Sequence, residues 1–104
     1  MPKYVLAYHG GSRPQTPAEQ AQVMDAWIAW FGTLGDAVVD VGNPTGAAKT
    51  VSADGSIADG GGANPLNGYS LLTATDLDAA VGLAKGCPIL VAGGSVEVAE
   101  AINM

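Results

Sequence analysis

The sequence predicts one α+β domain in which two β-α-β units build a single antiparallel sheet with both helices on the same face. Three observations predict it. The chain has 104 residues, 48% of them apolar and 13% charged, which fits one packed core. Two capping-box patterns each start a helix that follows a strand-like segment. A glycine-rich stretch over residues 42–68 separates the two units.

Residues 3–9 (KYVLAYH) predict the first strand. They are rich in aromatic and β-branched types, and Gly10 and Gly11 end the run. Both faces of this strand carry apolar side chains, a pattern typical of a strand that is covered on both sides.

The first helix begins with Thr16 as cap, Pro17 in the first helical position and Glu19 completing the box. Gly35 is placed to end it. An apolar stripe at helical spacing predicts which face packs on the sheet. The stripe consists of Val23, Met24, Trp27, Trp30, Phe31 and Leu34.

Residues 36–42 (DAVVDVG) predict the second strand, and seven glycines with several turn signals follow in residues 42–68. We interpret this segment as a long hairpin connection. Within it, residues 49–55 (KTVSADG) can pair as a short strand, and residues 59–65 (DGGGANP) are expected to be irregular.

Residues 68–74 (GYSLLTA) predict the next strand, and Thr75 with Asp78 predicts a capping box for a helix over residues 76–85. Gly86 and Pro88 stop that helix. Residues 95–102 (SVEVAEAI) predict the last strand.

This order is the split β-α-β arrangement of ferredoxin-like folds. In such a fold the two helices cover only one face of the sheet. The first strand also carries apolar side chains on the other face, and these must be buried by something else. The simplest cover is the same face of a second copy, and the sequence therefore predicts a homodimer of the dimeric α/β-barrel type, with residues 1–104 as one domain.

The charge balance excludes two classes of partner. The chain has ten acidic residues and four scattered basic ones, which gives a net charge of −6. Binding to nucleic acid or to anionic membranes requires clustered Lys and Arg, so we expect neither.

Cys87 is the only cysteine, which excludes an intrachain disulfide and a thiolate metal pair, and we expect no metal and no cofactor. With no signal-peptide core and no apolar run of membrane-spanning length, the chain is expected in the cytoplasm.

Four segments of the second half resemble the YCII-related family: GYSLLTA (68–74), DLDAA (76–80), AKGCP (84–88) and GGSVEV (93–98). In that family a strand leads into a Leu-Asp-Glu-Ala-like helix, a Cys-Pro or Asp-Pro stop and a final strand with a Glu-Val pair. The similarity is best over residues 67–98. It implies the dimeric α/β-barrel fold for the whole chain.

The resemblance extends to the branch of the family named for an Asp-Gly-Pro-Phe motif, although this chain has DGGG at residues 59–62. Some relatives carry a His-Asp pair proposed as an active site. The matching positions here are Met24 or Asp25 and Cys87, so neither half of the pair is present. Some relatives are thought to be lyases of halogenated hydroxyquinols. The resemblance implies the fold rather than a reaction.

His9 is the only histidine and ends the first strand beside two glycines. With Asp40 of the second strand as an orienting partner, it is the candidate general base. The alternative, which we favour, is a half-buried histidine whose ring is held by a backbone carbonyl.

Aromatic residues at strand and helix spacing are candidates to line a pocket, although such residues more often form a core. They are Tyr4, Tyr8, Trp27, Trp30 and Tyr69. Lys49 follows a glycine-containing stretch and is a further ligand-binding candidate. The glycines of that stretch, however, lack the spacing of a phosphate-binding loop. Cys87 follows the end of a helix, where a thiolate is disfavoured, so a buried and inert thiol is expected.

Two functions are compatible with these residues. The first is a small dimeric enzyme that performs acid–base chemistry on a small, aromatic molecule. The second is a non-catalytic module that binds a small ligand or another protein, which the missing family pair favours.

Overall fold

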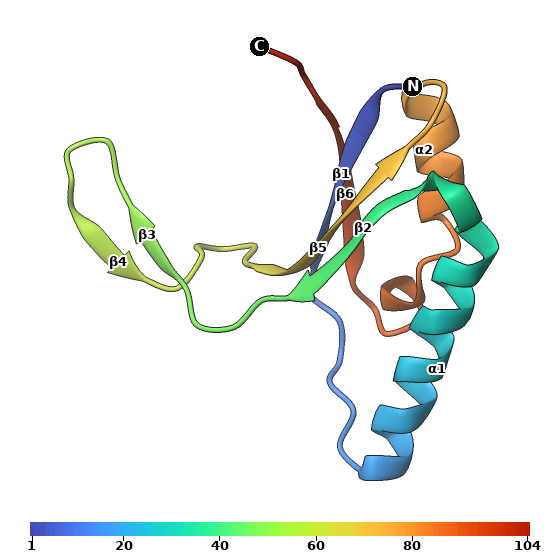
Figure 1. The fold of residues 1–104 in the computed structure, drawn as a ribbon. Coiled ribbons are helices and arrows are strands. Elements are labelled where there is room, and N and C mark those ends of the chain that lie inside the picture. Colours follow the sequence, from blue (N-terminus) through green and yellow to red (C-terminus); the bar gives the residue numbers. More distant parts are fainter.

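The computed structural model describes residues 1–104 and contains a four-stranded antiparallel sheet, a separate two-stranded hairpin and two α-helices (Figure 1). The strands of the sheet are β1 (Lys3–His9), β2 (Val38–Pro44), β5 (Leu66–Thr73) and β6 (Ser95–Ala101). The hairpin is β3 (Lys49–Val51) with β4 (Ile57–Asp59). The helices are α1 (Pro17–Leu34) and α2 (Leu77–Ala84), and 3₁₀ turns occupy Gly35–Ala37 and Pro88–Leu90.

The strand order β2-β5-β1-β6 confirms the ferredoxin-like split β-α-β fold. Both helices lie on one side of the sheet (Figure 1). We call this side the helix face and the other the open face. The core lies between the helices and the helix face. It consists of Tyr4, Leu6, Tyr8, Trp30, Leu72, Ala74, Ala80, Ala84, Cys87 and Ile89.

The helix caps follow from local chemistry, with one correction. Thr16 caps α1 as predicted, because its Oγ1 accepts the Glu19 N–H at 3.1 Å, and Gly35 ends the helix with φ of 55°. The cap of α2 is Asp76 and not Thr75. Its carboxylate accepts the Ala79 N–H at 2.7 Å, so α2 begins one residue later than a Thr75 cap requires.

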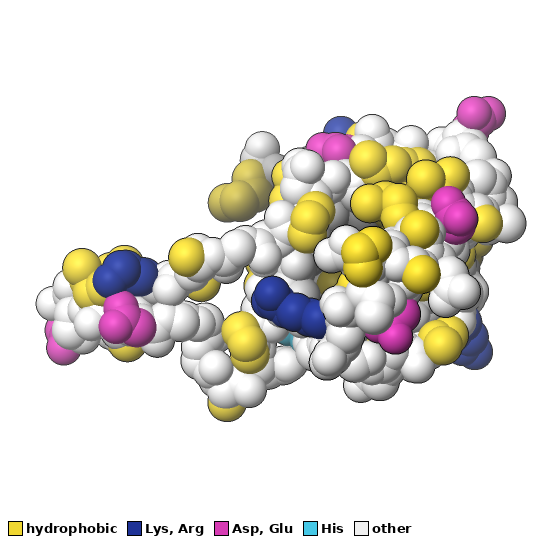
Figure 2. Space-filling view, turned by 90° about the horizontal axis from the view of Figure 1, so that it is seen from below, with side chains coloured by type: hydrophobic (Ala, Val, Ile, Leu, Met, Phe, Trp, Pro, Cys, Tyr) yellow, Lys and Arg dark blue, Asp and Glu magenta, His cyan; other side chains and the backbone are white.

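Residues 45–65, which connect β2 to β5, form an arm that extends away from the helices (Figure 1). Its strands β3 and β4 pair only with each other, which confirms the short strand predicted near residue 49. Every residue from 46 to 66 is exposed. Figure 2 shows the arm apart from the body. The exposed side chains of Lys49 and Asp59 form an ion pair on the arm. The arm therefore adds nothing to the core.

No helix combines the length and the apolar character that crossing a membrane would require.

Candidate functional site

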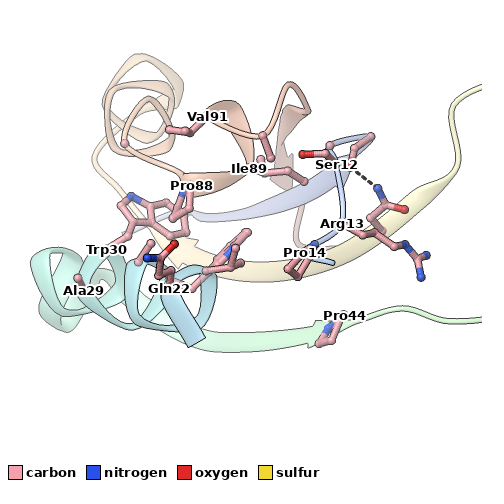
Figure 3. A pocket seen from close by; sticks show the side chains of 18 of the residues that line it. Ser12, Arg13, Pro14, Gln22, Ala29, Trp30, Pro44, Pro88, Ile89 and Val91 are labelled. Atoms are coloured by element: carbon pink, nitrogen blue, oxygen red, sulfur yellow. Dashed lines mark hydrogen bonds between the residues drawn. The ribbon is translucent and has the colours of Figure 1, made fainter. Parts of the chain in front are cut away.

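The first half of α1 stands away from the sheet and leaves a cleft in two connected parts. One part, of about 860 Å³, lies between α1 and the ends of β2 and β5, and we call it the sheet part. The other, of about 980 Å³, lies between α1, residues 10–14 and residues 86–92, and we call it the loop part (Figure 3). The residues common to both are Pro14, Val23, Trp27, Pro44, Asn67 and Ile89.

The predicted apolar stripe of α1 explains why a cleft forms here. Trp30 packs into the core, but Val23, Met24 and Ile28 stay exposed and line the cleft, with Met24 and Ile28 each 61% exposed. On the opposite wall, Val41 of β2 is exposed as well. Apolar surfaces on two facing walls favour an apolar occupant, because burying them from water is stabilising.

Trp27 is the centre of an aromatic cluster at the cleft. Its ring meets Tyr8 edge-on, with centroids 4.9 Å apart and an interplanar angle of 79°. Trp30 and Phe31 lie 5.7 Å and 5.9 Å from it. The Trp30 indole N–H donates to the Leu83 carbonyl at 3.2 Å, which ties α1 to α2 and fixes this wall. The cluster presents a rigid surface on which a flat molecule can stack.

A short hydrogen-bonded chain lies beneath the sheet part. The Tyr8 hydroxyl donates to Ser70 Oγ at 2.7 Å, and Ser70 Oγ donates to the Val41 carbonyl at 2.7 Å. Burial raises the pKa of Tyr8 to about 12, so the phenol is protonated at neutral pH. Because its proton is directed to Ser70, the Tyr8 oxygen is left as an acceptor for a donor on a bound molecule.

His9 lies on the other side of the sheet and lines neither part of the cleft. It follows Tyr8 in β1, and side chains alternate between the faces of a strand, so His9 belongs to the open face. Its Nδ1 is 3.1 Å from the Pro65 carbonyl, and its Nε2 is 3.3 Å from Glu97 Oε1. The ring is 10% exposed, whereas Glu97 is 67% exposed.

These two contacts have a chemical consequence. A carbonyl and a carboxylate both accept hydrogen bonds, so the imidazolium form of His9 satisfies both partners and the neutral form satisfies one. The contact between His9 Nδ1 and the Pro65 carbonyl matches the alternative favoured from the sequence, in which a backbone carbonyl holds the ring.

Asp40 does not orient His9, which corrects the predicted dyad. In the sheet, Asp40 is opposite Leu71 of β5, and Leu71 is opposite Val5 of β1, four residues from His9. The Asp40 carboxylate instead accepts the Gly42 N–H at 2.8 Å. Glu97 of β6 takes the position beside His9 that Asp40 was expected to fill.

The predicted ligand residues separate into three groups. Tyr8 and Trp27 meet in the cleft. Tyr69 also borders the sheet part, but the alternation of β5 places its side chain on the open face, where its hydroxyl accepts from Asn43 Nδ2 at 3.3 Å. Lys49 lies on the arm and pairs with Asp59 at 2.8 Å, so it is not part of the cleft.

Sequence reasoning missed three polar groups. Ser70 and Glu97 acquire their roles only through strand pairing, which no local pattern reveals. Asn67 lies in the glycine-rich stretch that predicts a connection, but it is the second residue of β5 and borders both parts of the cleft. An Asn-Gly pair at the start of an apolar strand was the available signal.

Cys87 is buried, and this burial raises the pKa of its thiol to about 11, so the thiol is protonated at neutral pH. No group of three or more His, Cys, Asp or Glu side chains is placed to hold a metal ion.

Comparison with known proteins identifies a fold relative. No protein-family model and no curated protein sequence matches the chain. Among solved structures, it is similar to 5-chloro-2-hydroxyhydroquinone dehydrochlorinase from Burkholderia phenoliruptrix AC1100, in its complex with 2,5-dihydroxybenzoquinone. The TM-score is 0.57 and the identity is 17%, over 98% of this chain and 95% of that one. A likeness at this identity shows a shared fold.

Proposed function

We propose that this chain binds a small, planar aromatic molecule in the cleft between α1 and the sheet. The observation that carries the proposal is the α1 wall of the cleft, where Trp27 stands beside exposed apolar side chains and faces exposed Val41 of β2. Aromatic rings and a few placed polar groups are typical of small-molecule sites. The Tyr8 oxygen supplies one such group, an acceptor for a ligand hydroxyl.

The fold relative supports the aromatic class, since it is a dehydrochlorinase whose structure contains 2,5-dihydroxybenzoquinone. The motifs of residues 67–98 support a place in the YCII-related family. Both observations favour a hydroxylated ring as the ligand.

A second candidate is acid–base catalysis on the bound ring, which the relative's chemistry favours. In one subunit, the titratable side chain at the base of the cleft is Tyr8, because His9 lies on the open face. Tyr8 is protonated at neutral pH and is suited to hold a ligand oxygen rather than to remove a proton.

The experiment measures binding of hydroquinone, 2,5-dihydroxybenzoquinone and 2-naphthol by calorimetry and by quenching of tryptophan fluorescence. We expect Trp27→Leu to weaken binding about tenfold or more, since stacking on an aromatic wall is lost. His9→Gln, on the opposite face, is the matched control and should leave affinity unchanged. Binding that survives Trp27→Leu intact, or the absence of binding by all three compounds, would contradict the proposal.

We propose that the working form is a homodimer in which a second copy covers the open face. The half-buried apolar side chains of Val5, Ala7 and Leu71 alternate with the core residues of β1 and β5, and neither helix lies over them. A sheet that is apolar on both faces is typically covered on both.

A further inference from the structure

The cleft differs from the rest of the molecule in its charge. The chain carries ten acidic and four basic side chains, yet none of the ten carboxylates lines either part of the cleft. Among the basic side chains, Arg13 alone lines it, in the loop part. In this acidic protein, the only charged side chain that lines the cleft is therefore a cation.

The loop that carries Arg13 is fixed at several points. Gly10 and Gly11 have φ of 68° and 88°, a conformation that glycine adopts without strain, and a side chain at Gly11 would meet Ile89 at 3.2 Å. The Ser12 N–H donates to the Ala92 carbonyl at 2.9 Å. On the other side, Asn67 Nδ2 donates to the Gly10 carbonyl. The backbone of residue 13 is therefore held at the cleft by contacts with both neighbouring segments.

Arg13 is exposed and takes part in neither of the two ion pairs of the structure, which join His9 to Glu97 and Lys49 to Asp59. Figure 3 shows Arg13 at one end of the loop part and Trp30 at the other, with Pro14 and Ile89 between them. A guanidinium presents a planar pair of donors that matches a carboxylate or a delocalised enolate.

We infer that the ligand of this cleft is an organic anion whose aromatic body lies against the Trp27 wall and whose negatively charged group meets Arg13. This inference rests on the proposed function and narrows it to aromatic acids and ionised hydroxyquinone-like rings. The net charge of −6 repels anions from the surface at large, so a single cation at the mouth of a carboxylate-free cleft directs them to this place.

The test compares two ligands of almost equal shape, 2-naphthoate and neutral 2-naphthamide, by isothermal titration calorimetry. We expect the wild-type protein to bind the acid about fivefold to tenfold more tightly, the gain typical of one charge-assisted contact at an exposed site. Added salt should reduce this preference and leave the affinity for the amide unchanged.

Three variants complete the test. Arg13→Gln should abolish the preference for the acid without changing the affinity for the amide, and Arg13→Lys should retain most of it. Lys49→Gln removes the same charge from the arm, outside the cleft, and should keep the preference. If the wild type binds both compounds equally, or if Arg13→Gln keeps the preference, this inference fails and aromatic binding stands. If the wild type binds neither compound, the proposed function itself fails.

Discussion

Tyr8 and His9 are neighbours in β1, but their side chains lie on opposite faces of the same sheet. The two faces differ in what surrounds these side chains. On the helix face, Tyr8 is buried among aromatic rings, and the cleft beside it contains no carboxylate. On the open face, His9 meets a carboxylate and a backbone carbonyl, with no helix above it. The features suited to recognising a ring and the only imidazole of the chain are thus separated by a single layer of backbone.

The largest expected effect tests the helix face. Leu72→Ala should lower the free energy of unfolding by about 2–5 kcal/mol, because Leu72 is fully buried and its loss leaves a cavity. The core lies within one chain, so the cost should not depend on protein concentration. Urea unfolding at several protein concentrations measures it. A cost below about 1 kcal/mol would show that this face is less tightly packed than its burial indicates.

The next effect tests the open face. Leu71 precedes Leu72 in β5, and its side chain lies on this face. In the proposed homodimer, Leu71→Asp places a charge in the interface, so the variant should be a folded monomer under conditions in which the wild type is a dimer. Sedimentation velocity and circular dichroism distinguish the outcomes. Leu71→Ala is the milder control and should weaken association without abolishing it. A wild-type protein that stays monomeric at micromolar concentration would contradict the homodimer.

The smallest expected effect concerns the pH dependence of stability on the helix face. Burial raises the pKa of Cys87 to about 11, so the folded state keeps its thiol protonated after the unfolded state has begun to ionise. The contribution of Cys87 to stability should therefore be complete below about pH 8.5 and decline as the pH rises toward 11. Urea unfolding at a series of pH values should show a smaller decline over this range for Cys87→Ala. An identical decline in both proteins would mean that the thiol is not shielded from water.

Local chemistry explains which parts of the fold the sequence predicts. Thr16 and Gly35 mark the ends of α1 because a cap needs only neighbouring residues. The same reasoning placed the cap of α2 at Thr75 when Asp76 performs the role, since two adjacent residues can both accept the hydrogen bond and only packing decides between them.

Strand pairing explains what the sequence could not predict about the site. A His9–Asp40 dyad requires β1 and β2 to be neighbours, but β5 lies between them. Glu97 reaches His9 because β6 pairs with β1, a contact between residues 88 positions apart. The aromatic cluster was partly predictable, since the helical stripe that contains Trp27, Trp30 and Phe31 predicted which face of α1 packs on the sheet. The alternation of side chains along β1 then places Tyr8 on the same face as Tyr4.

The arm gives the chain a natural point of division. A cut between Asp54 and Gly55, in its exposed turn, produces two fragments, one containing β1, α1 and β2 and the other β5, α2 and β6. In the order β2-β5-β1-β6, every strand pairs only with strands of the other fragment, so neither fragment can build the sheet alone. The arm turn is therefore where this protein can be split into a complementation pair, whose reassembly restores all three strand pairings of the sheet, and with them the core, at once.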